Sequence, residues 1–177
     1  MRRKIVIERA TRDDEPSLLD IGVRCFGSMG VSHRQLLYQI TRAKGIVLVA
    51  RVNGMVVGGI VCLTHAGWKR AHVYYLAVHP DWRRRHVGRR LLKAAINYAY
   101  SEGMVAVTLE VKKDNEPAFC LYRGSGFSIQ KLLLDYYFFH DAYRMRAELF
   151  PNATRMVNGY SRGRRRLYPP RATGETR

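Results

Sequence analysis

A strand-like apolar run, a basic turn that contains glycine, and an amphipathic helix follow one another between residues 78 and 92. Val78 ends the apolar run, Gly88 lies at the end of the turn, and Leu91 and Leu92 begin the apolar stripe of the helix. The first N–H groups of a helix have no partner within it and lie at the positive end of its dipole. This order of elements therefore predicts a site for a phosphate-bearing ligand, held by main chain as well as by arginine.

The rest of the hydrophobic pattern predicts alternating strands and helices in one domain, residues 1–150. Asn53-Gly54 is a strong hairpin signal, and the two glycines in residues 26–31 predict a loop. The expected strands cover about residues 4–9, 46–52, 55–63, 74–78, 104–111, 127–134 and 137–147. The expected helices begin near Thr11 and at about residues 32–43, 87–101 and 116–123.

The chain carries 31 basic and 14 acidic side chains, which gives a net charge of +17. This excess indicates either a well-solvated surface or an anionic partner. Part of it lies in the turn, and part lies in residues 151–177, a basic and proline-containing tail. We expect the tail to be an appendage to the core that contacts the ribosome or RNA, or else a solubilising segment.

Other features predict a cytoplasmic protein with no structural metal. The three cysteines are scattered and show no Cys-x-x-Cys spacing, which is typical of reduced thiols. The basic start is not followed by the apolar stretch of a signal peptide. The longest apolar run, residues 55–63, is far shorter than the roughly 20 residues that cross a membrane, so no membrane association is expected.

Six segments in addition occur in a characteristic order: Leu109-Glu110-Val111, Asn115, Leu121-Tyr122, Gly126-Phe127, Tyr136-Tyr137 and Asp141-Ala142-Tyr143-Arg144-Met145. With the basic turn, they resemble the GNAT acyltransferases over about residues 3–147. Within that superfamily they are similar to the ribosomal-protein alanine N-acetyltransferases and to the archaeal and eukaryotic N-terminal acetyltransferases. The resemblance implies an α/β (α+β) GNAT fold. Its seven-stranded, mixed and mostly antiparallel sheet is splayed between the fourth and fifth strands and flanked by about four helices.

Two side chains are candidates for proton transfer. Glu110 lies in a mostly apolar strand, where burial is expected to raise its pKa; alternatively it faces water or pairs with Lys112. Tyr122 has a phenol that can protonate a leaving thiolate, although a tyrosine on a short helix is often a core aromatic. The resemblance implies that Glu110 is the base and Tyr122 the acid.

The resemblance also implies acetyl-CoA as co-substrate. The backbones of Leu76, Ala77 and Val78 would pair with its pantetheine arm, and the Val78 N–H would face the thioester oxygen. Asn115 would bond the cofactor, and it is equally a good N-cap. The residues expected to hold the cofactor at the turn are Arg84, Arg85, His86, Val87, Gly88 and Arg89. His86 stands where the family carries glycine, so it must accept the backbone angles of that turn.

The acceptor site is expected between the loop from Phe26 to Ser32 and the Tyr136-Tyr137 hairpin, with Phe26, Tyr136 and Tyr137 as substrate-binding residues. The resemblance implies transfer of an acetyl group to the N-terminal α-amine of protein or peptide substrates. Acetylation of lysine or of small amines is an alternative, because the fold does not fix the substrate. A basic ribosome- or RNA-binding protein without turnover is a third possibility. The sequence leaves open whether the protein is a monomer or a homodimer.

Overall fold

The computed structural model describes residues 4–27, 30–137 and 139–149. Their strands form one seven-stranded sheet in the order β1-β2-β3-β4-β5-β7-β6. Only β4 and β5 pair in parallel, so the sheet is mixed and mostly antiparallel, as predicted. The bounds are β1 Ile5–Arg9, β2 Gly45–Val52, β3 Met55–His65, β4 Arg70–Val78, β5 Ala106–Lys112, β6 Ser128–Tyr137 and β7 His140–Glu148. The predicted tail, residues 151–177, lies outside the described residues.

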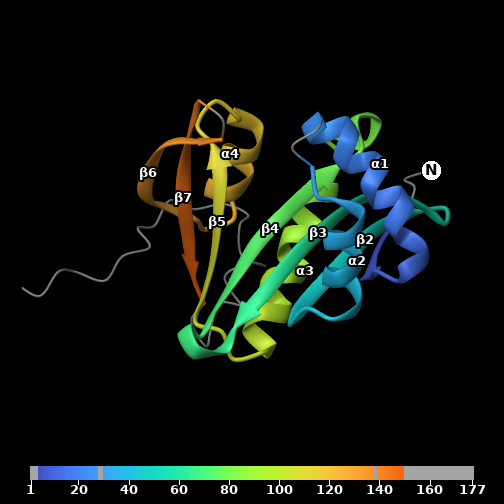
Figure 1. Ribbon diagram of the computed structural model, residues 1–177, viewed down its shortest axis with the longest axis horizontal. Coiled ribbons are helices and arrows are strands. Elements are labelled where there is room, and N and C mark those ends of the chain that lie inside the picture. The colour runs from blue at the N-terminus through green and yellow to red at the C-terminus, as the bar shows by residue number, and fades with distance from the viewer. Residues whose placement is uncertain (1–3, 28–29, 138, 150–177) are drawn as a thin grey trace, which may run out of the picture.

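Helices cover both faces of the sheet (Figure 1). α1 (Glu15–Phe26) and α2 (His33–Thr41) lie on one face, and α3 (Val87–Ser101) lies on the other, while α4 (Glu116–Arg123) lies beside β5. Two glycines of β3 permit this close packing. A Cβ on Gly59 would lie 2.2 Å from Leu18 of α1, and one on Gly58 would lie 2.8 Å from the Ala77 carbonyl oxygen.

The sheet is splayed at its centre. β4 pairs with β5 only along residues 70–73 and 106–109. Beyond this stretch the two strands separate, as their upper ends in Figure 1 show. The predicted splay between the fourth and fifth strands is therefore confirmed. Backbone groups of β4 beyond Val73 have no β5 partner, and this leaves main-chain donors beside the gap.

A bulge in β4 lies where the splay begins. Val61 pairs with Tyr75 and Cys62 pairs with Val73, so Tyr74 is an extra residue in β4. The bulge changes the faces to which the side chains of β4 point. Val73 belongs to the core beneath α3, whereas Tyr75 and Ala77 pack in the second core beneath α1 and α2.

Several boundaries differ from those predicted. α1 continues to Phe26, where the sequence predicted a loop, and β4 begins at Arg70 instead of residue 74. β6 runs to Tyr137, past its predicted end at residue 134, and the last strand, predicted to begin at residue 137, begins at His140. An irregularity between Leu133 and Tyr137, with a φ of 50° at Asp135, interrupts the alternation there and hides the continuation of the strand. None of the helices in the described part of the chain has the length and apolar character to cross a membrane.

Candidate active site at the sheet splay

The predicted phosphate turn leads into α3 through two residues in left-handed conformation. Arg84 has a φ of 59° and His86, the N-cap of α3, has a φ of 62°. His86 thus adopts backbone angles that favour glycine, which costs about 1 kcal/mol for a residue with a Cβ. The His86 side chain does not cap the helix, and its first turn carries no acidic residue. The first amides of α3 therefore remain available for an anion.

The arginines of the turn have different roles. Arg83 donates to the Val78 carbonyl oxygen over 3.4 Å, and Arg90 donates to the Ile5 carbonyl oxygen over 3.2 Å. These two guanidinium groups brace the backbone around the turn. The Arg85 guanidinium lies 5.1 Å from the centre of the Trp82 ring. Arg84, Arg85 and Arg89 are exposed at the start of α3, where the predicted ligand would lie.

Gly88, at the start of α3, lies close to α4, and Asn115 is the N-cap of α4. A Cβ on Gly88 would lie 3.4 Å from Leu121 and 3.6 Å from Val78, so only a small side chain fits there. Val87, the first residue of α3, is buried in the main core. The Asn115 side chain accepts from the Ala118 N–H over 3.3 Å and caps the helix that carries Tyr122. The predicted capping role of Asn115 is confirmed, while its contact with a cofactor stays a prediction.

Backbone groups of β4 face the gap. The His79 N–H donates to the Val57 carbonyl oxygen over 2.9 Å. Successive residues of an antiparallel strand alternate between facing the partner strand and facing away from it. The N–H group of Ala77 therefore points toward β3, whereas the N–H groups of Leu76 and Val78 point away from β3. The Val78 carbonyl oxygen, on the same side, accepts from the Cys25 thiol over 3.3 Å.

Glu110 of β5 lies at the centre of a polar network with side chains of β4 and β7. Its Oε1 accepts from Arg144 over 2.8 Å, and its Oε2 lies 3.0 Å from His72 Nε2. The other ring nitrogen of His72 lies 2.8 Å from the Thr108 hydroxyl. The Glu110 side chain is only 8% exposed, so the network leaves a narrow approach to the carboxylate. Lys112, the partner considered from the sequence, instead lies 5.9 Å from the centre of the Tyr137 ring.

The expected rise in the pKa of Glu110 is wrong. Burial does act to raise this pKa, but the hydrogen bonds and charges of His72 and Arg144 outweigh it, and the pKa lies below the ordinary glutamate value. Glu110 is thus an ionised carboxylate at neutral pH. Because its pKa is lowered, Glu110 is a weaker base than the sequence suggested, but as a carboxylate it can stabilise a positive charge on a bound amine.

Tyr137 interacts electrostatically with both Tyr122 and Glu110. Burial raises the pKa of Tyr122 above its ordinary value, and Tyr137 adds to the effect. Burial also raises the pKa of Tyr137 to about 12, with further contributions from Tyr136 and Glu110. Both phenols therefore keep their protons at neutral pH. The Tyr122 ring also packs against Phe127 with 5.8 Å between ring centres, so it is a core aromatic as well.

The candidate acceptor residues come from two elements. Tyr136 and Tyr137 lie at the end of β6 and meet edge to face, with ring centres 4.9 Å apart. Arg144 also interacts with the Tyr136 hydroxyl, which joins this pair to the Glu110 network. Phe26 is the last residue of α1 and packs edge to face on Tyr75, 5.7 Å away. Ser28 and Met29, in the predicted loop wall, lie outside the described residues.

Sequence reasoning did not identify His72, Thr108 and Arg144 as parts of one network. The sequence indicated part of this network, because Thr108 and Glu110 are two residues apart in a strand and therefore share one face of the sheet. The remainder depended on register: β7 places Arg144 opposite Glu110, and β4 places His72 opposite Thr108. Among the described residues, no group of three or more His, Cys, Asp or Glu side chains could hold a metal ion.

Several relatives share sequence with this chain. An uncharacterized protein from Mycobacterium leprae is 43% identical over 103 residues, which are 56% of this chain and 28% of the relative. The [Ribosomal protein bS18]-alanine N-acetyltransferase of Salmonella typhimurium is 35% identical over 75 residues, 42% of this chain and 51% of that enzyme. An N-alpha-acetyltransferase from Sulfurisphaera tokodaii is 39% identical over 114 residues, 57% of this chain and 68% of that enzyme. The chain thus spans about half or less of the first two relatives.

Solved structures share the fold. Ard1 from Thermoplasma volcanium has 27% identity and a TM-score of 0.74, over 82% of this chain and 98% of that one. The PaiA N-acetyltransferase from Thermoplasma acidophilum, solved in complex with coenzyme A, has 19% identity and a TM-score of 0.69, over 82% of this chain and 99% of that one. The sequence model of the Acetyltransferase (GNAT) family matches residues 16–127, more than half of the chain. This protein belongs to the Acetyltransferase (GNAT) family.

Proposed function

We propose that this protein transfers an acetyl group from acetyl-CoA to the N-terminal α-amine of protein substrates. The proposal rests on two features of the splayed region: uncapped helix amides beside arginines, and the ionised Glu110 carboxylate, which Tyr137 links electrostatically to the buried phenol of Tyr122. The names of two relatives, an alanine N-acetyltransferase and an N-alpha-acetyltransferase, support the choice of acceptor.

The residues present fit coenzyme A. The amides of Val87, Gly88 and Arg89, with the exposed side chains of Arg84 and Arg85, would hold its pyrophosphate. The N–H groups of Leu76 and Val78 offer main-chain donors to an extended ligand in the gap. A structure of the same fold that contains coenzyme A supports this assignment. Bound acetyl-CoA would supply a thioester, whose carbonyl oxygen the Val78 N–H would polarise.

The chemistry is a direct attack, in which a C–N bond forms and the C–S bond breaks. The amine nitrogen gains positive charge as it attacks, and it must then lose a proton. The Glu110 carboxylate stabilises that charge and accepts the proton that the nitrogen releases. Tyr122, which is protonated at neutral pH, donates its proton to the departing thiolate, and coenzyme A leaves as a thiol. Both side chains then return to their starting states by proton exchange with solvent. His72 and Arg144 hold the Glu110 carboxylate in place.

The acceptor is proposed to enter past Tyr136, Tyr137 and Phe26. Transfer to lysine or to small amines on the same site is the second candidate function, because Tyr136 is exposed and the fold does not fix the acceptor. We propose in addition that the protein acts in the cytoplasm. Its tail, residues 151–177, is proposed to contact the ribosome or RNA.

The pH dependence of kcat/KM should reflect the acceptor and not Glu110. The lowered pKa of Glu110 keeps it ionised throughout the neutral range. We therefore expect kcat/KM for a peptide to rise with pH up to the pKa of its α-amine, about 7.7 to 8.0. The measurement is a pH–rate profile with one peptide under subsaturating conditions. A rising limb well below the amine pKa that disappears in the Glu110→Gln variant would contradict the lowered pKa.

A matched pair of peptides tests the choice of acceptor. One peptide has a free N-terminus and no lysine, and the other has a blocked N-terminus and one internal lysine. We expect acetylation of the first and little or none of the second, when both are incubated with acetyl-CoA and followed by mass spectrometry. Equal rates, or modification of the lysine peptide alone, would replace this proposal with the lysine and small-amine alternative.

A further inference from the structure

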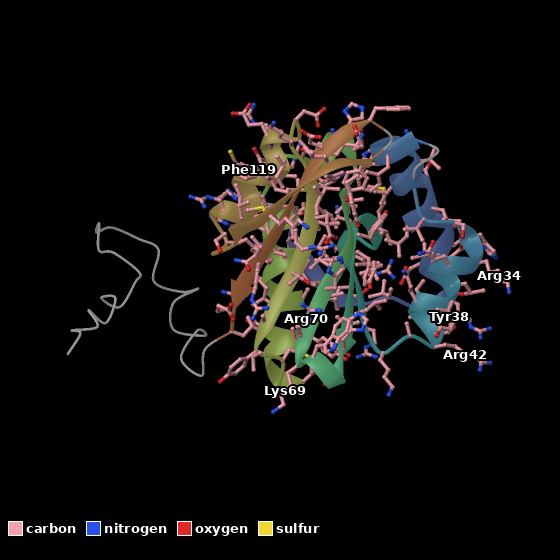
Figure 2. All side chains as sticks on the ribbon, turned by 60° about the vertical axis from the view of Figure 1, so that its left-hand side comes forward. Arg34, Tyr38, Arg42, Lys69, Arg70 and Phe119 are labelled. Atoms are coloured by element: carbon pink, nitrogen blue, oxygen red, sulfur yellow. The ribbon has the colours of Figure 1, made fainter. Side chains whose placement is uncertain are left out.

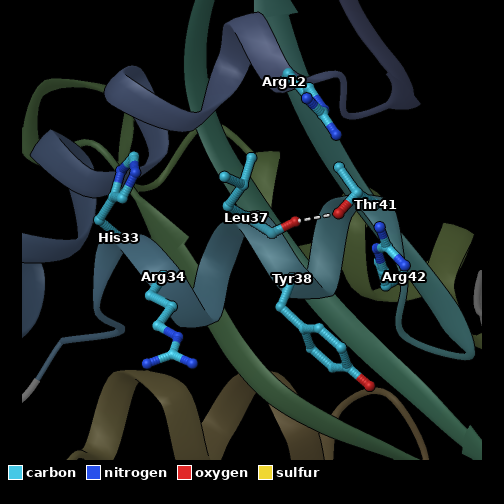
Figure 3. A pocket seen from close by; sticks show the side chains of 7 residues that line it. All are labelled: Arg12, His33, Arg34, Leu37, Tyr38, Thr41 and Arg42. Atoms are coloured by element: carbon cyan, nitrogen blue, oxygen red, sulfur yellow. Dashed lines mark hydrogen bonds between the residues drawn. The ribbon is translucent and has the colours of Figure 1, made fainter.

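A basic groove lies on α2, on the opposite face of the sheet from α3. Its volume is about 370 Å³, and it is lined by Arg12, His33, Arg34, Leu37, Tyr38, Thr41 and Arg42 (Figure 3). Arg12 belongs to the short 3₁₀ turn Arg12–Asp14 that precedes α1. The lining therefore contains three arginines and no acidic residue. None of these residues belongs to the candidate active site.

The three arginines are free to meet a ligand. Arg12, Arg34 and Arg42 are exposed, and none forms a salt bridge with a carboxylate of the described residues. Of the neighbouring acids, Glu15 pairs with His33 at 2.5 Å and Asp14 pairs with Arg51, which leaves the exposed Asp13 beside Arg12. The three arginines outnumber this carboxylate, in a chain whose net charge is +17. Such a groove attracts an anion.

Tyr38 gives the groove an aromatic surface between two cations. Arg34, Tyr38 and Arg42 are spaced by four residues, so they follow one another along one side of α2 over about 12 Å. All three project from the edge of the molecule, on the side away from Phe119 of α4 (Figure 2). Tyr38 is 58% exposed, so its ring is accessible to a ligand.

We propose that this α2 groove binds a single-stranded RNA segment, with Arg12, Arg34 and Arg42 on its phosphates and a base stacked on Tyr38. Cations that follow a backbone, combined with an aromatic platform, are the usual means of holding single strands. Bases within a duplex are already stacked and cannot lie on Tyr38. A purely acidic protein segment would use the arginines but would leave the tyrosine without a role.

The test compares two double variants of the full chain with equal loss of charge. One is Arg34→Gln with Arg42→Gln, and the control is Arg123→Gln with Lys131→Gln, which removes two exposed cations from α4 and β6. Binding of a fluorescent oligouridylate is measured over a range of salt concentrations. We expect the α2 variant to lose about tenfold or more in affinity, with a salt slope lower by roughly 1.4. The control should stay within about threefold, and matched thermal unfolding checks that both variants fold.

Substitutions of Tyr38 test the stacking contact separately, because they change RNA affinity without changing the net charge. Tyr38→Ala should weaken RNA binding by about fivefold or more, and Tyr38→Phe should restore it, because the ring carries the stacking. Equal losses in the α2 and control variants would show unspecific attraction and overturn the proposal. Unchanged affinity in the α2 variant would overturn it as well. So would tighter binding of a polyglutamate peptide than of RNA, with the peptide sensitive to Arg34 and Arg42, because the occupant would then be an acidic protein.

Discussion

Replacing Glu110 by Gln is expected to lower kcat for peptide acetylation by ~10² or more and to leave coenzyme A affinity nearly unchanged. Gln has the same shape, but it cannot carry the negative charge that meets the developing ammonium. Its amide also places N–H groups against donors of His72 or Arg144, so the network loses one of its bonds. The measurement is steady-state kinetics with one peptide, alongside calorimetry with coenzyme A.

Glu148→Gln is the matched control for this prediction. Glu148 pairs with Arg146 at 2.6 Å on β7, so the substitution weakens another arginine–glutamate pair in the same half of the sheet, one whose glutamate side chain is 47% exposed. We expect its kcat to remain near that of the unmodified protein. If Glu110→Gln retained full turnover, Glu110 would have only a structural role. Equal losses in both variants would indicate a general effect on the sheet.

The parts of the fold that depend on local signals were predictable. The start of α3 at Val87 follows from an apolar stripe after a basic turn, and the β2–β3 hairpin follows from Asn53-Gly54. The cap at Asn115 is likewise a short-range preference. In each case the residues that decide the structure lie within a few positions of one another, so the sequence contains most of the information.

The chemistry of Glu110 depended on distant residues and was not predictable in the same way. Apolar neighbours along β5 correctly indicated burial, but the sign of the pKa shift was set by His72 on β4 and Arg144 on β7. Those residues reach Glu110 only through the register of three strands. The bulge at Tyr74 has the same origin, since it arises from pairing between β3 and β4 and not from a turn signal.

Replacing Gly88 by Val is expected to abolish coenzyme A binding or to weaken it severely. The glycine lies where a Cβ would already be 3.4 Å from Leu121 and 3.6 Å from Val78. The methyl groups of valine exceed that space and would push the first turn of α3 away from β4. Because the backbone amides of this turn carry much of the proposed pyrophosphate site, their displacement removes the donors together. Single losses of Arg84 or Arg85 should cost much less.

Gly88→Ala is the control, because a single Cβ fits at ordinary contact distance. We expect it to fold and to bind coenzyme A with an affinity within a few-fold of the unmodified chain. If Gly88→Val and Gly88→Ala bound equally well, the first turn of α3 would not be the pyrophosphate site.

Calorimetric titration of coenzyme A into the intact protein is the most direct test that the start of α3 is the cofactor site. We expect saturable binding at one site per chain, greatly reduced by Gly88→Val and retained in Glu110→Gln. Absence of coenzyme A binding by the intact, folded protein would contradict this assignment.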